Sequence, residues 1–427
     1  MGNKIGLGEY NTFYKYIWYL IPSKLISDYF IGEFFQERIP LIGNNSMPQN
    51  VIIGEAFNFL GTLIISSIIF IFEILIKKKE NNIIENDHSI KTRQKSDSQI
   101  DYIYNEKNVL ISYKLFLFII ILLFLSIELK NFFFIISLKG LDYWIFEIVF
   151  VCWISNKLFK IPIYKHKLFA IYFIIFFCNL MKTLSLVFRF FDDPKERIYK
   201  SQKWIIPIGI ITFILITLLR AYTFCKIKWI MDVKFYSPIK FLMIYGFIGS
   251  LICFSISAVT DQVPCDVDDD TKSNVTYFCQ FNLTDENNNT IYYYDKFSIF
   301  FDSFENFGYV ILYIIKIFFS FGVKLFSLLI IKYLSPEYMI CANSIYFFIT
   351  GLIDFFVYLF TTNGFTLYKF FGTFTEFFHV VGSIIYLELI ELKCYKLDYN
   401  LKKNIKKRSM LDSMKVVNMD DINEEDD

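Results

Sequence analysis

Residues 261–296 read DQVPCDVDDDTKSNVTYFCQFNLTDENNNTIYYYDK, and this stretch decides how the rest of the chain is placed. It is a polar segment between two strongly apolar runs, and it carries N-glycosylation acceptors at Asn274, Asn282 and Asn288. Such acceptors belong to surface loops in the secretory pathway. Cys265 and Cys279 are expected to form a disulfide in the same oxidising compartment. The segment is therefore predicted to be lumenal or extracellular, and the other loops alternate outward from it.

Composition indicates a membrane protein with many spans. Of the 427 residues 55% are hydrophobic, and the mean hydropathy is +0.43. Soluble domains are usually ~45–50% apolar. Several apolar runs reach the ~20 residues that a helix needs to cross a bilayer. We therefore expect an all-α bundle of about nine transmembrane helices within residues 51–392.

The predicted spans follow the apolar runs in order. They are residues 51–76, 112–137, 141–156, 168–190, 204–225, 239–260, 305–331, 339–360 and 369–392. Residues 10–35 are aromatic and weakly amphipathic, so they either lie along the membrane surface or form a tenth span. The surface position is favoured, which makes residues 1–50 lumenal. A tenth span would instead place the amino terminus in the cytosol.

Basic residues agree with the side that the acceptors predict. Lys77, Lys78 and Lys79 follow the first span directly, and residues 77–109 are predicted to be a flexible cytosolic loop. The tail at residues 393–427 is basic and then acidic, and is also predicted to be cytosolic. A fourth acceptor, Asn44, falls on the lumenal side. The expected location is an integral membrane of the secretory pathway, either the plasma membrane or an endomembrane.

Polar side chains inside the spans are the candidate functional residues, because each charge in the hydrocarbon costs at least ~2.5–3.5 kcal/mol. Several recur at helical spacing on one face of a span. We predict a hydrated intramembrane path that binds a solute or relays protons. Asp354 is expected to pair with Lys316 or Lys182. The alternative is that these groups pair between helices merely to hold the bundle together. The predicted path comprises Glu55, Asn58, Lys182, Lys316, Asn343, Asp354, Glu376 and His379.

The span at residues 239–260 carries a different stripe, made of small residues: Gly246, Ser250, Cys253 and Ser257. Such a stripe is typical of close packing between membrane helices rather than of ligand binding. Cys152, Cys178 and Cys341 also fall inside apolar runs, where a thiol is expected to behave as a small hydrophobic group.

Enzyme motifs are scarce. The sequence has three histidines, and His88 and His166 fall in predicted cytosolic loops, so a multi-histidine metal centre inside the membrane is excluded. No phosphate-binding loop or nucleophile elbow is found. We expect no catalytic residues, no metal, no cofactor and no nucleic-acid partner; the lipid bilayer is the expected partner.

The carboxyl-terminal quarter resembles a known group of proteins. Residues 334–338 read LSPEY, residues 385–392 read IYLELIEL and residues 400–405 read NLKKNI. These segments resemble the carboxyl-terminal signature of uncharacterised multi-pass membrane proteins of protists. The resemblance implies the membrane class and no activity. Glu388 and Glu391 lie at the cytosolic end of the last span, where they are expected to pair with Lys393, Lys396 or another loop.

Secondary transport of a small polar or charged solute is the function that these patterns favour. The alternative is a receptor or scaffold that does not transport and acts through its glycosylated loop and basic tail.

Overall fold

Nearly all of the described chain is helical. The computed structural model describes residues 7–31, 52–86, 146–159, 163–192, 205–233, 237–262, 307–360 and 367–390, together with three short strands and a few single residues. Contacts divide the chain into two compact units, each built from two separate stretches. The first unit comprises Met1–Lys139 and Lys226–Ser335, and the second comprises Gly140–Cys225 and Pro336–Asp427.

Among the described residues, four helices are long and apolar enough to cross a membrane: Ile52–Ile76, Lys165–Ser185, Pro238–Thr260 and Phe307–Tyr333. A shorter apolar helix covers Phe370–Tyr386. A helical protein compatible with membrane insertion is thus confirmed. The described residues contain four candidate spans and do not support the predicted count of nine. The predicted span at residues 112–137 lies almost entirely outside the described residues.

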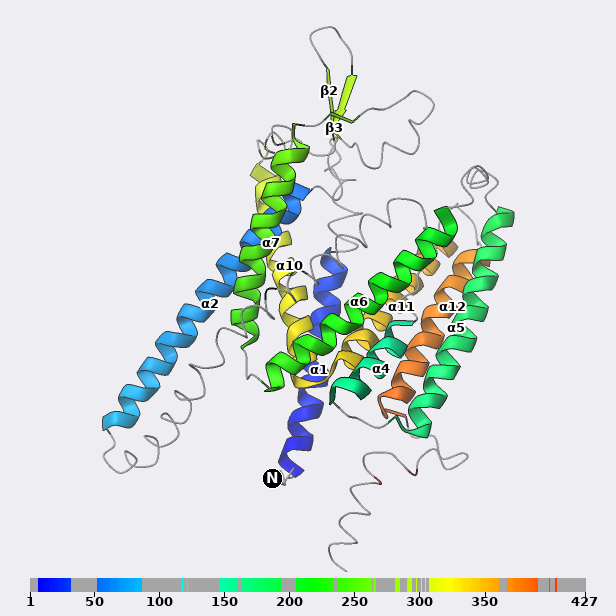
Figure 1. Ribbon diagram of the computed structural model, residues 1–427, viewed down its shortest axis with the longest axis horizontal. Helices are drawn as coiled ribbons and strands as arrows, with labels where there is room; N and C mark the ends of the chain where they lie inside the picture. The colour runs from blue at the N-terminus through cyan, green and yellow to red at the C-terminus, as the bar shows by residue number, and fades with distance from the viewer. Residues whose placement is uncertain are drawn as a thin grey trace, which may run out of the picture. The chain divides into compact units, whose positions relative to one another are not determined.

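Among the described residues, the first unit contains four whole helices: α1 (Leu7–Tyr29), α2 (Ile52–Asn86), α7 (Pro238–Thr260) and α10 (Phe307–Tyr333), besides the end of α6 (Ile205–Val233) and three short strands. α2 and α7 lie side by side and run in opposite directions, as Figure 1 shows. Gly246 of α7 faces the backbone of α2, and a Cβ atom there would lie 2.7 Å from the Leu63 nitrogen. Since that distance is too short for any side chain, the small-residue stripe predicted for this helix does serve close packing.

The other two helices of this unit pair with each other. α1 runs antiparallel to α10, with the Tyr16 ring stacked 4.6 Å from Tyr333 and the Phe30 ring 4.3 Å from Phe319. α10 also contacts α2, and the two run in the same direction because Tyr313 contacts Gly54 and Lys324, further along, contacts Thr62. The amino-terminal helix therefore follows a candidate membrane span for most of its own length.

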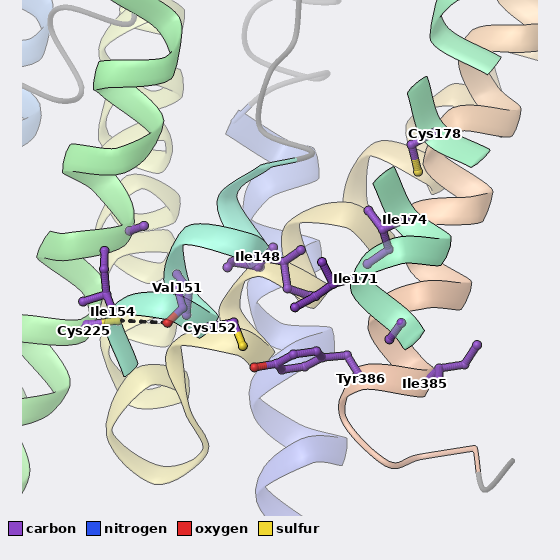
Figure 2. Packing of buried hydrophobic residues seen from close by; sticks show 13 residues of the cluster. Ile148, Val151, Cys152, Ile154, Ile171, Ile174, Cys178, Cys225, Ile385 and Tyr386 are labelled. Atoms are coloured by element: carbon purple, nitrogen blue, oxygen red, sulfur yellow. Dashed lines mark hydrogen bonds between the residues drawn. The ribbon is translucent and has the colours of Figure 1, made fainter. Parts of the chain in front are cut away.

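The second unit contains α4 (Glu147–Phe159), α5 (Lys165–Asp192), α11 (Pro336–Phe360), α12 (Leu367–Tyr386) and the part of α6 (Ile205–Val233) up to Cys225. α5 and α12 lie side by side and antiparallel (Figure 1). Figure 2 shows the apolar core, where Ile148 and Val151 of α4 lie near Ile171 and Ile174 of α5. Cys152 and Cys178 are buried in this core, as predicted for small hydrophobic groups.

Helix ends differ from the predicted spans at three places. α2 continues through the three lysines to Asn86, so the start of the predicted loop at residues 77–109 is helical; lysine and glutamate favour helix. α6 likewise continues past Cys225 to Val233. α12 ends at Tyr386, before the predicted residue 392.

The early end of α12 has a specific cause. The Leu389 N–H donates to the Ile384 carbonyl oxygen and the Glu388 N–H donates to the Ile385 carbonyl oxygen. This pair of hydrogen bonds is a Schellman motif, which closes a helix. Glu388 takes the left-handed position of the motif, with φ of 62°. Glycine is usual there because a side chain makes this conformation unfavourable.

A small antiparallel sheet follows α7, an element that the all-α prediction does not include. Its strands are β1 (Pro264–Cys265), β2 (Phe281–Thr284) and β3 (Thr290–Tyr293), in the order β1-β3-β2. β3 is rich in β-branched and aromatic residues, which favour strands.

Candidate functional site: buried polar clusters

The residues of the predicted intramembrane path fall in both units. Glu55, Asn58 and Lys316 belong to the first unit. The remaining five belong to the second unit: Lys182, Asn343, Asp354, Glu376 and His379. Each unit therefore has its own set of polar side chains.

In the first unit, the side chain that reaches the polar stripe of α2 is Lys324. Its Nζ donates a hydrogen bond to Thr62 Oγ1 at 3.2 Å. The same Nζ lies 4.3 Å from the centre of the Phe59 ring and 6.0 Å from that of Tyr245. Both distances are within the range of cation–π attraction. One ammonium group thus contacts side chains of α2 and α7 while belonging to α10.

Lys324 was not predicted as a site residue, because it lies about 80° from the face that carries Lys316 at 100° per residue. A lysine side chain is long enough to reach around its helix. The signal in the sequence was the charge itself, in the middle of an apolar run. A helical wheel misses such a residue because the wheel shows only the angular position of each residue on the backbone and not how far its side chain extends.

Lys316 and Glu55 lie near the same end of α10 and α2. Lys316 Nζ lies 5.7 Å from the centre of the Tyr313 ring, and the Tyr313 hydroxyl donates to the Gly54 oxygen at 2.8 Å. The charge of Glu55 acts on both Lys316 and Lys324. Among the described residues neither lysine has a carboxylate at ion-pair distance.

Asn58 of α2 is the third residue of the predicted path that lies in the first unit. It is 2% exposed, and its Oδ1 has no hydrogen-bond partner among the described residues. Thr62, one turn further on, donates its own hydroxyl hydrogen to the Asn58 backbone oxygen at 2.7 Å. The threonine oxygen can therefore accept the hydrogen bond from Lys324. Buried polar atoms are normally satisfied, so the Asn58 side chain is a candidate contact for a ligand.

In the second unit, His379 of α12 contacts Ser344 of α11. The Ser344 hydroxyl lies within hydrogen-bond distance of both His379 Nδ1 and the Ile340 oxygen. If the hydroxyl donates to the carbonyl, it accepts from Nδ1–H, which selects that tautomer of the histidine. His379 and Ser344 are 1% and 0% exposed. The predicted histidine is therefore in the interior, joined to a serine that was not predicted.

Two further polar side chains flank this histidine and serine. Asn343 precedes Ser344 on α11, and Ser383 follows His379 by one turn on α12. Both are buried, and Asn343 Nδ2 and Ser383 Oγ have no hydrogen-bond partner among the described residues.

Lys182 and Glu376 lie on the two helices that form the closest pair of the second unit. Lys182 lies on α5 between Cys178, which donates to the Thr375 oxygen at 3.4 Å, and Ser185. Glu376 follows Thr375 on α12, and its charge acts on Cys178. Both charged side chains are half-buried along this interface.

Glu147 and Arg220 form an ion pair that sequence reasoning did not identify. Arg220 Nε of α6 lies 3.1 Å from Glu147 Oε1 of α4, and the glutamate side chain is 1% exposed. Glu147 and Arg220 fall within the predicted spans at residues 141–156 and 204–225, but neither belongs to the predicted path. This pair is the arrangement that the alternative interpretation predicts, with an acid and a base binding two helices together.

Glu388, which has the left-handed backbone conformation at the end of α12, also contacts a titratable side chain. His166 Nε2 lies 3.1 Å from Glu388 Oε1, and the His166 ring stacks on Tyr164. His166 is at the start of α5 and is buried. Glu388 was expected to pair with Lys393, Lys396 or another loop; the contact found here is with His166, which was predicted to lie in a loop and is the second residue of α5.

Several predicted features lie outside the described residues. The Asp354 backbone belongs to α11, but its side chain is among the undescribed ones, so its pairing with Lys316 or Lys182 stays a prediction. The same holds for the Cys265–Cys279 disulfide, since residue 279 is undescribed. Of the four acceptors, Asn282 lies in β2, and the other three, Asn44, Asn274 and Asn288, are undescribed.

No protein-family model matches this sequence, and comparison with curated proteins finds no significant match.

Proposed function

We propose that the chain is a multi-pass membrane protein that transports a small polar or charged solute along its buried polar side chains. The observation that carries this proposal is the position of Lys316 and Lys324. Both belong to the interior of a candidate span, and neither has a carboxylate at ion-pair distance among the described residues. Intramembrane charges of this kind mark substrate or ion pathways in membrane proteins.

The depth of the two lysines supports this interpretation. The middle of α10 is near residue 320, so each lysine lies four residues from it. Four residues correspond to about 6 Å along a helix. The hydrocarbon core extends roughly 15 Å to either side of its centre. A lysine that merely anchors a helix at the membrane surface would lie near the helix end, as Lys332 does.

Helix directions support a chain that crosses the membrane repeatedly. If successive spans cross the membrane in opposite directions, α2 and α10 must run the same way and α7 the opposite way. The contacts between these helices show these directions. In the second unit α4 and α6 run the same way, since Glu147 meets Arg220 and Ser155 meets Cys225. α12 runs opposite to both α5 and α11.

The same argument extends to α1. It runs antiparallel to α10 and has 23 residues, which span about 34 Å as a helix. We therefore favour ten spans, with the amino terminus on the cytosolic side and the glycosylated loop at residues 261–296 on the lumenal side.

Reconstitution of the purified protein in liposomes tests transport. We expect uptake of at least one solute from a panel of organic anions, organic cations, sugars and amino acids. Lys316→Ala and Asp354→Asn should each abolish uptake while the unfolding temperature in detergent stays close to that of the parent protein. Lys332→Gln is the control, because it changes a lysine at the end of the same helix. If intramembrane substitutions leave function intact and deletion of residues 393–427 removes it, the receptor or scaffold alternative gains.

A further inference from the structure

The surroundings of Lys324 indicate what kind of solute the first unit binds. This inference rests on the proposed function, since it concerns the ligand of the same intramembrane group. An ammonium group has three N–H donors. Thr62 Oγ1 accepts one at 3.2 Å, and the Phe59 and Tyr245 rings contact the charge through their faces. No further hydrogen bond to Lys324 is found among the described residues, which leaves donor capacity for an acceptor from outside the protein.

Lys324 has no carboxylate at ion-pair distance among the described residues. On α1, Lys24 and Asp28 pair with each other and cancel. Glu55 lies beside Gly54, which contacts Tyr313, and Tyr313 is one turn from Lys316. Glu55 therefore lies nearer to Lys316 along the helices, although its charge also acts on Lys324. Lys324 lies eight residues further along α10, about 12 Å away along the helix axis.

Lys324 thus has no counter-charge in direct contact among the described residues of its unit. A lone cation in a low-dielectric interior is unfavourable unless an anion accompanies it. A ligand with a single negative charge neutralises one ammonium group, whereas a cation would repel it and a dianion would leave a negative charge in excess. A monoanion is therefore the ligand that suits a single ammonium group.

The side chains around Lys324 indicate which other groups the ligand carries. Phe59 and Tyr245 lie with their ring centres 5.1 Å apart beside the ammonium group, so an apolar part of the ligand can pack against them. Asn58 Oδ1, buried and without a partner among the described residues, is one turn of α2 away from Thr62. A carbonyl oxygen of this kind accepts a hydrogen bond from a hydroxyl or amide group.

We propose that α2, α7 and α10 form a binding site for a small organic monoanion of the carboxylate class. Lys324 binds the carboxylate, Phe59 and Tyr245 contact its apolar part, and Asn58 accepts a hydrogen bond from a hydroxyl group on it. Lys316 lies eight residues away from Lys324 on α10, nearer to Glu55.

Thermal unfolding of the purified full chain in detergent tests the ligand class. The probes are acetate, propionate, L-lactate and benzoate as monoanions, succinate as a dianion, choline as a cation and glucose as a neutral solute. We expect a saturable rise in unfolding temperature with the monoanions and none with choline or glucose. L-Lactate should bind more tightly than propionate, because it carries a hydroxyl group that would donate a hydrogen bond to Asn58 Oδ1.

Variants locate the site. Lys324→Gln should raise the apparent Kd for L-lactate at least tenfold, whereas Lys324→Arg keeps it within a few-fold and shows that the charge is responsible. Asn58→Leu should remove the advantage of L-lactate over propionate without abolishing propionate binding. Lys332→Gln, on the same helix, should leave both affinities unchanged.

Uptake into liposomes separates this inference from the proposed function. Uptake of choline or glucose without binding of any monoanion overturns the carboxylate site and leaves transport standing. Binding of L-lactate that depends on Lys324, without uptake of any solute, keeps the site and overturns transport. Monoanion binding that Lys324→Gln leaves unchanged, or no binding of any monoanion, overturns the site.

Discussion

In the second unit the buried carboxylate of Glu147 lies 3.1 Å from Arg220, whereas in the first unit Lys324 has a threonine hydroxyl and two aromatic rings as neighbours. Both charges belong to helices of a predicted membrane bundle. The first is neutralised by its own protein and binds two helices together. The second is held in place without being neutralised. The comparison teaches that a charge inside a span is informative about function only when its partner is known.

The largest effect is expected from breaking the ion pair of the second unit. Arg220→Met removes the cation of the ion pair while Glu147 stays buried, and should cost about 3–5 kcal/mol of unfolding free energy. Unfolding in detergent measures this loss. The double variant Glu147→Gln, Arg220→Met should recover most of it, because no charge is then left unpaired. A single variant as stable as the parent protein would show that the pair contributes little.

Helix packing in the first unit gives the next largest effect. Gly246→Ala places a methyl group 2.7 Å from the Leu63 nitrogen, and this overpacking should cost about 1–3 kcal/mol. Gly372→Ala in the second unit is the matched control, since a Cβ atom there would lie 3.7 Å from Ser185 Oγ. Alanine favours helix over glycine, so the control should be neutral or more stable by up to about 1 kcal/mol. Equal unfolding temperatures for the two variants would contradict the close approach of α7 to α2.

Removing the charge of Lys324 in the first unit should have a smaller effect on stability than breaking the ion pair of the second unit. Lys324→Met loses a hydrogen bond worth about 1 kcal/mol but also removes the unfavourable burial of a charge. We expect the unfolding free energy to change by less than about 1 kcal/mol in either direction, while binding of L-lactate is lost. A loss as large as that of Arg220→Met would assign Lys324 a structural role and remove the contrast between the units.

The end of α12 offers another small effect. Glu388→Ala removes the contact with His166 and keeps a side chain in the left-handed conformation. Glu388→Gly removes the same contact and relieves the conformation, so it should be more stable than Glu388→Ala by about 1 kcal/mol. Glu388→Asn should fall between them, because asparagine tolerates this conformation. If Gly and Ala variants unfold at the same temperature, the left-handed conformation at this position is not a source of strain.

The helices themselves were largely predictable. The span predicted at residues 239–260 agrees with α7 to within one residue, because an apolar run between polar flanks defines a helix in a membrane. The end of α12 was predicted six residues too late, since a Schellman motif without glycine leaves no signal in the sequence. The sheet after α7 was also missed, because its strands are short and lie within a polar segment.

The polar contacts were less predictable. The sequence shows which residues share a face of one helix, and Asn58, His379 and the small residues of α7, which it singles out, are buried in the structure. Which face of one helix meets which face of another depends on how the helices are rotated and paired. The contact of His379 with Ser344 and that of Glu147 with Arg220 join residues 35 and 73 positions apart, and no local pattern relates them.

The division of each unit into two stretches has a consequence for synthesis. α5 pairs with α12, and roughly 175 residues separate Asp192 from Leu367. At ~5–20 residues per second, a ribosome needs roughly 10–35 s to make that segment. During this time the surface of α5 that carries Lys182 and Cys178 has not yet met its partner. The second unit is therefore completed late in translation, and a chain that stops short of α12 would present this surface to the lipid or to the quality-control machinery of the membrane.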